Sequence, residues 1–299
     1  MPENPTDQAS REAASFFQSL AEREGMAPSF VRLQEALFQF RRDELKRDAT
    51  PIDSPAPAVI EEAFGHGRCL AQQVRLIPPP KILHETFQRL LAVLFAHCEL
   101  PSSFRKWAQG AASADGLLEN WLEAMSSKDQ HVLAAFAEKS GQDEEILRWV
   151  GRELARPFYY QYGRIISMKD LSAWHHGACP CCGGAARMAR LEKETGRRHL
   201  WCDLCDVQWS FSRVQCPFCG NDDTEQLGNL DVEEQSRYRI AVCQQCEGYL
   251  RTIDERQLPE GIFANMPLED VATLPLDFVA RREGYRQGLL DREKENHLS

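Results

Sequence analysis

The chain has 299 residues and a formal net charge of −10, and 43% of its residues are hydrophobic. This length allows two or three domains with real cores. The acidic balance disfavours a general binder of nucleic acid or anionic membranes, which needs a basic surface. No apolar run reaches the roughly 18 residues of a membrane helix, and the polar N-terminus does not resemble a signal peptide. We therefore expect a cytoplasmic protein without stable membrane insertion.

Residues 1–168 are predicted to form an α-helical bundle, because apolar residues recur at helical spacing and no strand-like alternation competes. One helix is expected to begin at Pro28, ahead of an apolar stripe. Another is expected over 60–74, and the three prolines that follow would stop it. The segment 81–98 is strongly apolar, so we expect it to be the central helix.

Three further helices are predicted before residue 168. Asp115 is a candidate cap for the first of them, and Ser127 with Gln130 has the spacing of a capping box for the second. The third begins near residue 143. Pro157 is expected to kink or split it, because proline lacks the N–H that continues a helix.

The cysteines are clustered rather than spread along the chain. Nine of the eleven lie between residues 179 and 246, and eight of these form four C-x-x-C pairs. Adjacent pairs close almost no loop, so a disulfide scaffold is a poor interpretation. In a reducing cytoplasm such clusters usually indicate metal or redox chemistry. The pairs are Cys179/Cys182, Cys202/Cys205, Cys216/Cys219 and Cys243/Cys246.

The pairs form two matched modules of about 40 residues, each opening with C-P-x-C-G. Two residues between cysteines allow a tight turn that points both sulfurs at one ion, and backbone N–H groups can donate to those sulfurs. Pro180 and Pro217 help to set the turn, and Gly183 and Gly220 permit the left-handed residue that closes it. Short strands are expected beside the pairs, at 198–202, 208–211, 236–243 and 249–253.

Two such turns facing each other across a hairpin would complete a tetrahedral site of four thiolates. Zinc and iron both suit this geometry. Modules of this size bury too little apolar surface to fold alone, so the metal would supply much of their folding free energy. The repeated opening motif favours pairing within each module, and a cross-braced arrangement that joins the first pair with the third remains the alternative.

Other interpretations of these residues are weaker. A thioredoxin-like dithiol would show one C-x-x-C at a strand-to-helix junction, not four. Cys181 is a spare cysteine, either inert or an exposed thiol. His175 and His176 lie close to Cys179 and could be ligands in principle, but four cysteines already serve each site. Cys69 is expected to pack in the core as a small hydrophobic residue.

The surroundings of the cysteines are acidic. Residues 179–253 contain nine Arg and Lys against eleven Asp and Glu, and thiolates around divalent ions would make the region more negative. Zinc ribbons that bind nucleic acid usually have the opposite charge. A nucleic-acid-binding zinc ribbon is therefore the lower alternative.

A helical N-terminal half followed by this cysteine pattern resembles the formate dehydrogenase accessory protein family, type E. The cysteine array is the specific part of the resemblance, and the helical half matches in kind and extent. The matching residues are Cys179-Pro-Cys-Cys182-Gly, Leu200-Trp-Cys202-Asp-Leu-Cys205, Trp209, Arg213 and Cys216-Pro-Phe-Cys219-Gly-Asn.

The resemblance implies a cytoplasmic maturation factor or chaperone for respiratory formate dehydrogenase, acting on its catalytic subunit. It implies rubredoxin-like modules that hold two metal ions per chain, iron rather than zinc, with the eight paired cysteines as ligands. Four thiolates leave no open position for substrate, and no catalytic triad, P-loop or Rossmann glycine pattern occurs elsewhere. We therefore expect a protein that is not an enzyme. A rubredoxin-like electron carrier is the alternative.

The expected fold class is mainly α, with two tandem rubredoxin-like or zinc-ribbon-like β modules and a short helical tail. The helical domain spans 1–168, the first four-cysteine module 169–213 and the second 214–253. Residues 254–299 return to helix, with short helices expected at Pro267 and after Pro275.

Overall fold

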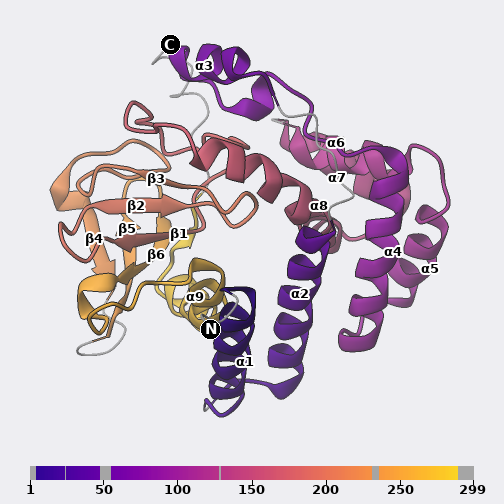
Figure 1. Cartoon of the computed structure of the whole chain (residues 1–299), viewed down its shortest axis with the longest axis horizontal. Coiled ribbons are helices and arrows are strands. Elements are labelled where there is room, and N and C mark those ends of the chain that lie inside the picture. The colour runs from indigo at the N-terminus through magenta and orange to yellow at the C-terminus, as the bar shows by residue number, and fades with distance from the viewer. Residues whose placement is uncertain (1–4, 24, 48–54, 128, 231–235, 289–299) are drawn as a thin grey trace. The chain divides into compact units, whose positions relative to one another are not determined.

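A computed structural model of the chain shows two compact units, which are described separately (Figure 1). The first comprises residues 1–52 and 76–161, and the second comprises 53–75 and 162–299. The structure describes residues 5–23, 25–47, 55–127, 129–230 and 236–288.

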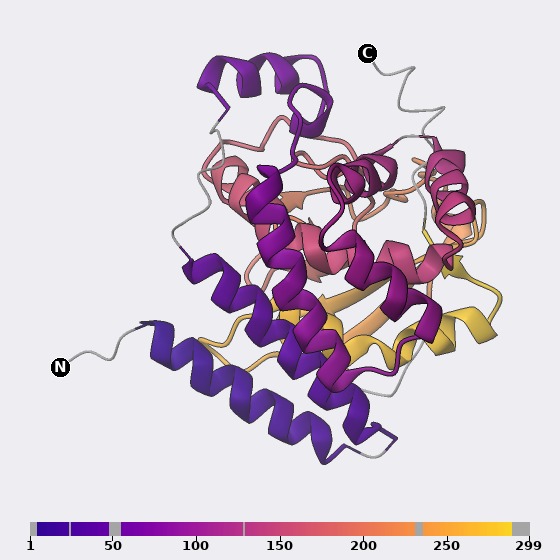
Figure 2. The same cartoon turned by 90° about the vertical axis from the view of Figure 1, so that its right-hand side faces the viewer.

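The first unit is helical, as predicted. Helices α1 and α2 lie side by side (Figure 2), and α2 packs along α4. Both α2 and α4 carry proline in their first turn, where the missing N–H costs no helical hydrogen bond. The helices are α1 (Pro5–Ala21), α2 (Pro28–Lys46), α4 (Pro80–His97), α5 (Ser102–Ala111), α6 (Leu117–Ser126), α7 (Gln130–Ser140) and the first part of α8 (Glu144–Ser167).

A buried ion pair joins α2 to α4. Glu44 is only 6% exposed, and Arg89 donates to its two carboxylate oxygens at 2.7 and 2.8 Å. Thr86 donates to the same carboxylate at 3.3 Å. The buried Glu44 carboxylate is therefore paired with an opposite charge and a hydroxyl. These directional contacts fix the register of α2 against α4.

Several helix limits differ from the sequence prediction. The helix expected over 60–74 ends early: α3 (Pro57–Gly65) stops before Gly67, whose φ of +64° breaks helical geometry, and a single 3-10 turn η1 (Leu70–Gln72) follows. Helix α7 is capped by Asp129, which accepts from the amide of His131, rather than by Ser127. Helix α8 continues through Pro157 without splitting.

One sheet of seven strands organises the second unit within the described residues. Its order is β3-β2-β1-β6-β5-β4, with β7 paired to β6. Each cysteine module contributes three antiparallel strands, and the parallel pairing of β1 with β6 joins the modules into one sheet. The strands are β1 (Met188–Leu191), β2 (Arg198–Trp201), β3 (Gln208–Ser210), β4 (Leu227–Leu230), β5 (Tyr238–Cys243), β6 (Gly248–Asp254) and β7 (Arg286–Gln287).

Two short helices pack on this sheet, α9 (Met266–Thr273) and α10 (Pro275–Arg282). Met266 is buried with Met188 and Ile253, which connects α9 to both modules. Leu276 and Ala280 of α10 are buried with Ile240, Val242 and Tyr249. The C-terminal segment therefore contributes to the core of the metal-module unit.

The predicted fold class is confirmed: a helical N-terminal region, a sheet that carries the cysteine modules, and short C-terminal helices. The division of the chain into the four predicted segments stays a prediction. Among the described helices, none combines the length and apolar character that a membrane span requires.

Candidate metal centres

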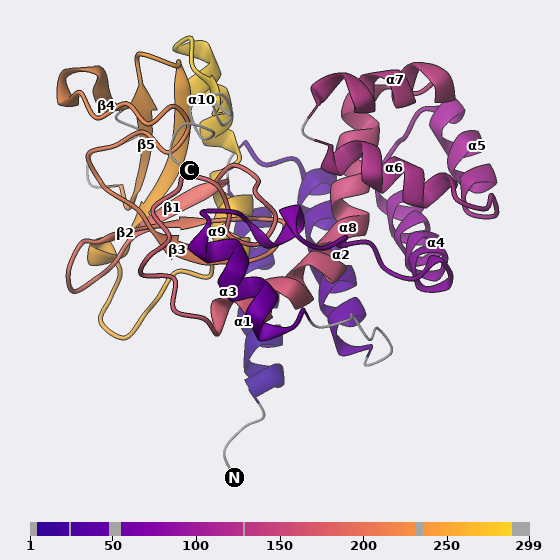
Figure 3. The ribbon, with the colours of Figure 1, turned by 90° about the horizontal axis from the view of Figure 1, so that it is seen from above.

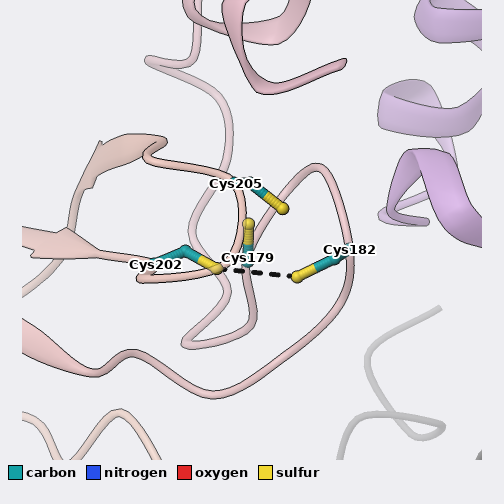
Figure 4. Close-up of side chains that lie close together, drawn as sticks. All are labelled: Cys179, Cys182, Cys202 and Cys205. Atoms are coloured by element: carbon teal, nitrogen blue, oxygen red, sulfur yellow. Dashed lines mark hydrogen bonds between the residues drawn. The ribbon is translucent and has the colours of Figure 1, made fainter. Parts of the chain in front are cut away.

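The first cysteine cluster brings together the two C-x-x-C pairs of the first module. The sulfurs of Cys179, Cys182, Cys202 and Cys205 all lie within 4.8 Å of one another and point towards a common centre (Figure 4). The Cys182 and Cys202 sulfurs are 3.6 Å apart. Pairing is thus within the module rather than cross-braced.

Two tight turns position these sulfurs. In the first turn, the amide of Gly183 donates to the carbonyl of Cys179 at 2.8 Å, and Gly183 has the expected positive φ of 70°. The amide of Gly184 donates to the Cys182 sulfur at 3.4 Å. In the second turn, between β2 and β3, Asp206 adopts a φ of 57° and its amide donates to the carbonyl of Cys202 at 2.8 Å.

The second cluster repeats this arrangement with Cys216, Cys219, Cys243 and Cys246, whose sulfurs also lie within 4.8 Å of one another. The Cys216–Cys246 and Cys219–Cys243 sulfur distances are 3.7 and 3.8 Å. The same positive φ recurs at Gly220 (74°) and at Glu247 (55°). The internal repeat seen in the sequence is therefore a repeat of turn geometry.

The sulfur spacing tests whether a metal would fit. A tetrahedral ion with metal–sulfur bonds of about 2.3 Å has sulfur–sulfur edges of about 3.8 Å. The sulfur–sulfur distances of 3.6, 3.7 and 3.8 Å match these edges, the other pairs lie within 4.8 Å, and all three distances are far longer than a disulfide bond of about 2.05 Å. Each donor set therefore fits zinc or iron and leaves no fifth ligand position. That the eight cysteines bind metal stays a prediction.

The other residues considered from the sequence lie outside both clusters. Cys181 is fully buried, which contradicts an exposed thiol. His176 packs its ring against Trp174, with centroids 4.8 Å apart, and its carbonyl accepts from the Trp209 indole at 2.9 Å. Neither His175 nor His176 belongs to a ligand group.

A segment far away in the sequence covers the first turn. The amides of Leu70 and Ala71 donate to the carbonyls of Pro180 and Cys181 at 3.0 and 2.9 Å. These contacts hold the segment against the backbone of the first turn, and residues 53–75 belong to the second unit. No local pattern in the sequence indicates this pairing, because both partners are backbone groups.

Two glycines allow the backbone to approach the clusters closely. A Cβ on Gly163 of α8 would lie 1.9 Å from the carbonyl oxygen of Cys205, and one on Gly177 would lie 1.8 Å from that of Pro217. Any side chain at either position would displace a cysteine turn. The end of α8 is therefore a support for the first cluster, a role that sequence reasoning missed.

Two thiols of the second cluster, those of Cys216 and Cys219, have raised pKa values. A hydrogen bond with Cys246, together with burial, raises the pKa of the Cys216 thiol. Burial raises the pKa of Cys219 to about 11. Binding of a metal ion must therefore displace at least these two protons near neutral pH.

We accordingly expect the dissociation constant of the second centre for zinc to rise at least about 100-fold between pH 8 and pH 7, tenfold for each proton displaced. The sign follows because lower pH favours the protonated, metal-free state. Competition titration with a chelator of known pH dependence measures the effect. An affinity that does not change with pH would contradict protonated thiols.

Comparison with protein families matches residues 178–213 to the central domain of FdhE. The Protein FdhE homolog of Aquifex aeolicus is 26% identical over 167 residues, which are 55% of this chain and 58% of that protein. The Protein FdhE of Escherichia coli K12 is 25% identical over 255 residues, which are 81% of this chain and 74% of that protein. The chain thus spans little more than half the length of the first relatives that it matches.

A solved structure shares the fold. The crystal structure of the FdhE protein from Pseudomonas aeruginosa superimposes with a TM-score of 0.60 over 92% of each chain, at 20% identity. At this identity the similarity concerns the fold alone. It extends beyond the cysteine region to the helical half, for which the sequence motifs gave no specific signal.

Proposed function

Because this chain belongs to the FdhE family, we propose that it is an accessory protein required for the assembly or activation of respiratory formate dehydrogenase. It acts in the cytoplasm by binding the catalytic subunit, and it is not an enzyme. The family resemblance is the reason for proposing formate dehydrogenase as the client. The two clusters indicate the chemistry of this chain.

The observation that carries the proposal is the pair of closed four-cysteine clusters on one sheet. A tetrathiolate ion has no vacant position for a substrate, so it stabilises structure or transfers single electrons. The clusters are mostly buried, which suits a structural role beneath a protein-binding surface. Both observations support a binding protein over a hydrolase.

A second candidate is a rubredoxin-like electron-transfer protein. It is favoured by the amide of Gly184, which donates to the Cys182 sulfur, since N–H donors to sulfur tune the potential of iron–thiolate centres. A nucleic-acid-binding zinc ribbon remains the lower candidate, because the chain carries a net charge of −10.

The proposal is tested in a strain that lacks the gene for this chain. Formate dehydrogenase activity is expected to be lost, and to return when the tagged chain is supplied. The tagged chain is expected to co-purify with the catalytic subunit. Normal activity in the deletion strain, together with no co-purification, would overturn the proposal.

Metal analysis separates the two candidates. Anaerobic purification from iron-replete cells, followed by elemental analysis and a visible spectrum, is expected to show two metal ions per chain. A coloured iron protein with a reversible one-electron couple would favour electron transfer. A colourless zinc protein that still restores formate dehydrogenase activity would leave only the structural role.

A further inference from the structure

A cavity of about 210 Å³ lies beside the second cysteine cluster, within the second unit. Its walls come from β4 at the edge of the sheet, from the neighbouring strands β5 and β6, and from the segment that leads into the cluster. Its lining includes Arg198, Arg213, Val214, Phe218, Gly228 and Asn229.

Arg198 is a buried cation without a carboxylate partner among the described residues. It is only 7% exposed, and one terminal nitrogen donates to the backbone carbonyls of Ser212 and Gln215. Its Nε has no acceptor in the part of the chain that the structure describes. Burial lowers its pKa to about 10, so it remains charged near neutral pH. The Phe211 ring, whose centroid lies 5.2 Å from the guanidinium carbon, and the Cys216 sulfur compensate part of this charge. A carboxylate in the cavity would compensate it further, because a buried charge costs free energy unless a counter-charge meets it.

The charged side chains that line the cavity are positive, whereas the chain as a whole is acidic. Two arginines line it and no Asp or Glu does, although the whole chain has a net charge of −10. Val214 adds an apolar wall that is 59% exposed, and Phe218 adds a buried one. A ligand with one negative charge and an apolar or neutral body matches this lining.

The neighbouring cluster limits the charge of the ligand. Cys216 and Cys243 also line the cavity, and a divalent tetrathiolate centre carries a net charge of about −2. The amide nitrogen of Asn221 offsets part of this charge, because it donates to the Cys243 sulfur at 3.7 Å. A phosphate dianion would still be repelled more strongly than a carboxylate. The lining therefore favours a carboxylate.

The form of the cavity indicates where the carboxylate comes from. Its volume is below the roughly 300 Å³ of sites that hold a whole small-molecule ligand, so it suits a single side chain. Gly228 and Asn229 are exposed residues of β4, which pairs only with β5 among the described strands (Figure 3). This edge carries neither the charge nor the proline that usually blocks strand addition.

We propose that this cavity binds an acidic side chain of an extended polypeptide that adds along the edge of β4, with Arg198 as the buried anchor and Arg213 at the rim. The inference goes beyond the proposed function and does not depend on which protein is the client. The backbone of the added segment would supply affinity, and the cavity would select the acid.

The test uses the full, metal-loaded chain and the side-chain Nε–H signal of Arg198 in a ¹H–¹⁵N NMR spectrum, assigned by its loss in Arg198→Lys. The probe is a blocked pentapeptide, acetyl-Val-Thr-Glu-Val-Thr-amide, and its control has Gln in place of Glu. We expect a saturable shift of this signal with the Glu peptide. The Gln peptide is expected to bind at least about 10-fold more weakly, because a charge-assisted hydrogen bond is lost.

Variants and a free carboxylate complete the test. Arg213→Gln is expected to weaken binding of the Glu peptide several-fold, whereas the exposed neighbour Arg197→Gln leaves it unchanged, both with two metals retained. Equal binding of the Glu and Gln peptides, or no shift with either, would overturn the proposal. If acetate binds as tightly as the Glu peptide, the claim that the bound carboxylate belongs to a polypeptide is wrong.

Discussion

Replacement of Cys219 by serine is expected to remove one of two metal ions per chain and to destabilise the sheet of the second unit. The Cys219 sulfur lies 3.8 Å from that of Cys243, inside the second four-cysteine group. A serine hydroxyl is a poor ligand for zinc or iron in a thiolate site, so the remaining three cysteines bind the ion weakly.

The expected loss of stability is large because metal binding contributes to folding directly. A structural zinc site contributes on the order of 10 kcal/mol of apparent binding free energy. The turn that holds Cys243 and Cys246 joins β5 to β6, and β6 is the strand that pairs with the first module. We therefore expect a loss of at least about 3 kcal/mol of unfolding free energy, measured by urea denaturation after elemental analysis.

Cys181→Ser is the matched control, because Cys181 is buried beside the first cluster but belongs to neither group. This variant is expected to keep two metal ions. Loss of a metal from Cys181→Ser, or two ions retained in Cys219→Ser, would show that the ligand assignment is wrong. Cys202→Ser should in turn affect the first centre alone.

The cysteine clusters could be read from the sequence because their geometry is local. A C-P-x-C-G turn needs only its own proline and glycine, and Gly183 and Gly220 have the expected positive φ. Asp206 and Glu247 close the partner turns in the same conformation without being glycine. The positive φ at those two positions could have been predicted by aligning the repeats, but not from the residue types.

What the sequence could not show depends on contacts between distant residues. The parallel pairing of β1 with β6 merges two modules into one sheet, yet β1 is short and lacks a strong strand signal. The pairing of Leu70 with Pro180 is a backbone contact across more than one hundred residues. Arg198 appears in the sequence as one basic residue among many, and only the structure shows that it is buried without a carboxylate partner among the described residues.

Arg251→Met is expected to cost about 3–5 kcal/mol of unfolding free energy, because it breaks a buried network of charges. Arg251 of β6 is 1% exposed and donates to the Thr273 hydroxyl at 2.7 Å. Its guanidinium pairs with Asp270 of α9 and lies 3.0 Å from Asp277 of α10. Arg187 contacts the same two carboxylates at 3.2 and 3.4 Å.

The expected loss of unfolding free energy follows from the carboxylate charge that remains buried in Arg251→Met. Arg187, Arg251, Asp270 and Asp277 form a network of two cations and two anions between the sheet and the two C-terminal helices. Removal of Arg251 therefore leaves Arg187 as the one cation of this network beside two largely buried carboxylates. Urea denaturation of the metal-loaded protein measures the effect. The exposed ion pair of Arg282 with Glu283 gives the control, since Arg282→Met should change stability by less than about 1 kcal/mol.

A second substitution separates charge from packing. In Arg251→Met combined with Asp270→Asn, one cation and one anion are gone, so the net charge of the network is restored. We expect the double variant to recover about 1–2 kcal/mol relative to Arg251→Met. No recovery would mean that Arg251 stabilises α9 and α10 through its carbonyl and hydroxyl contacts rather than through its charge.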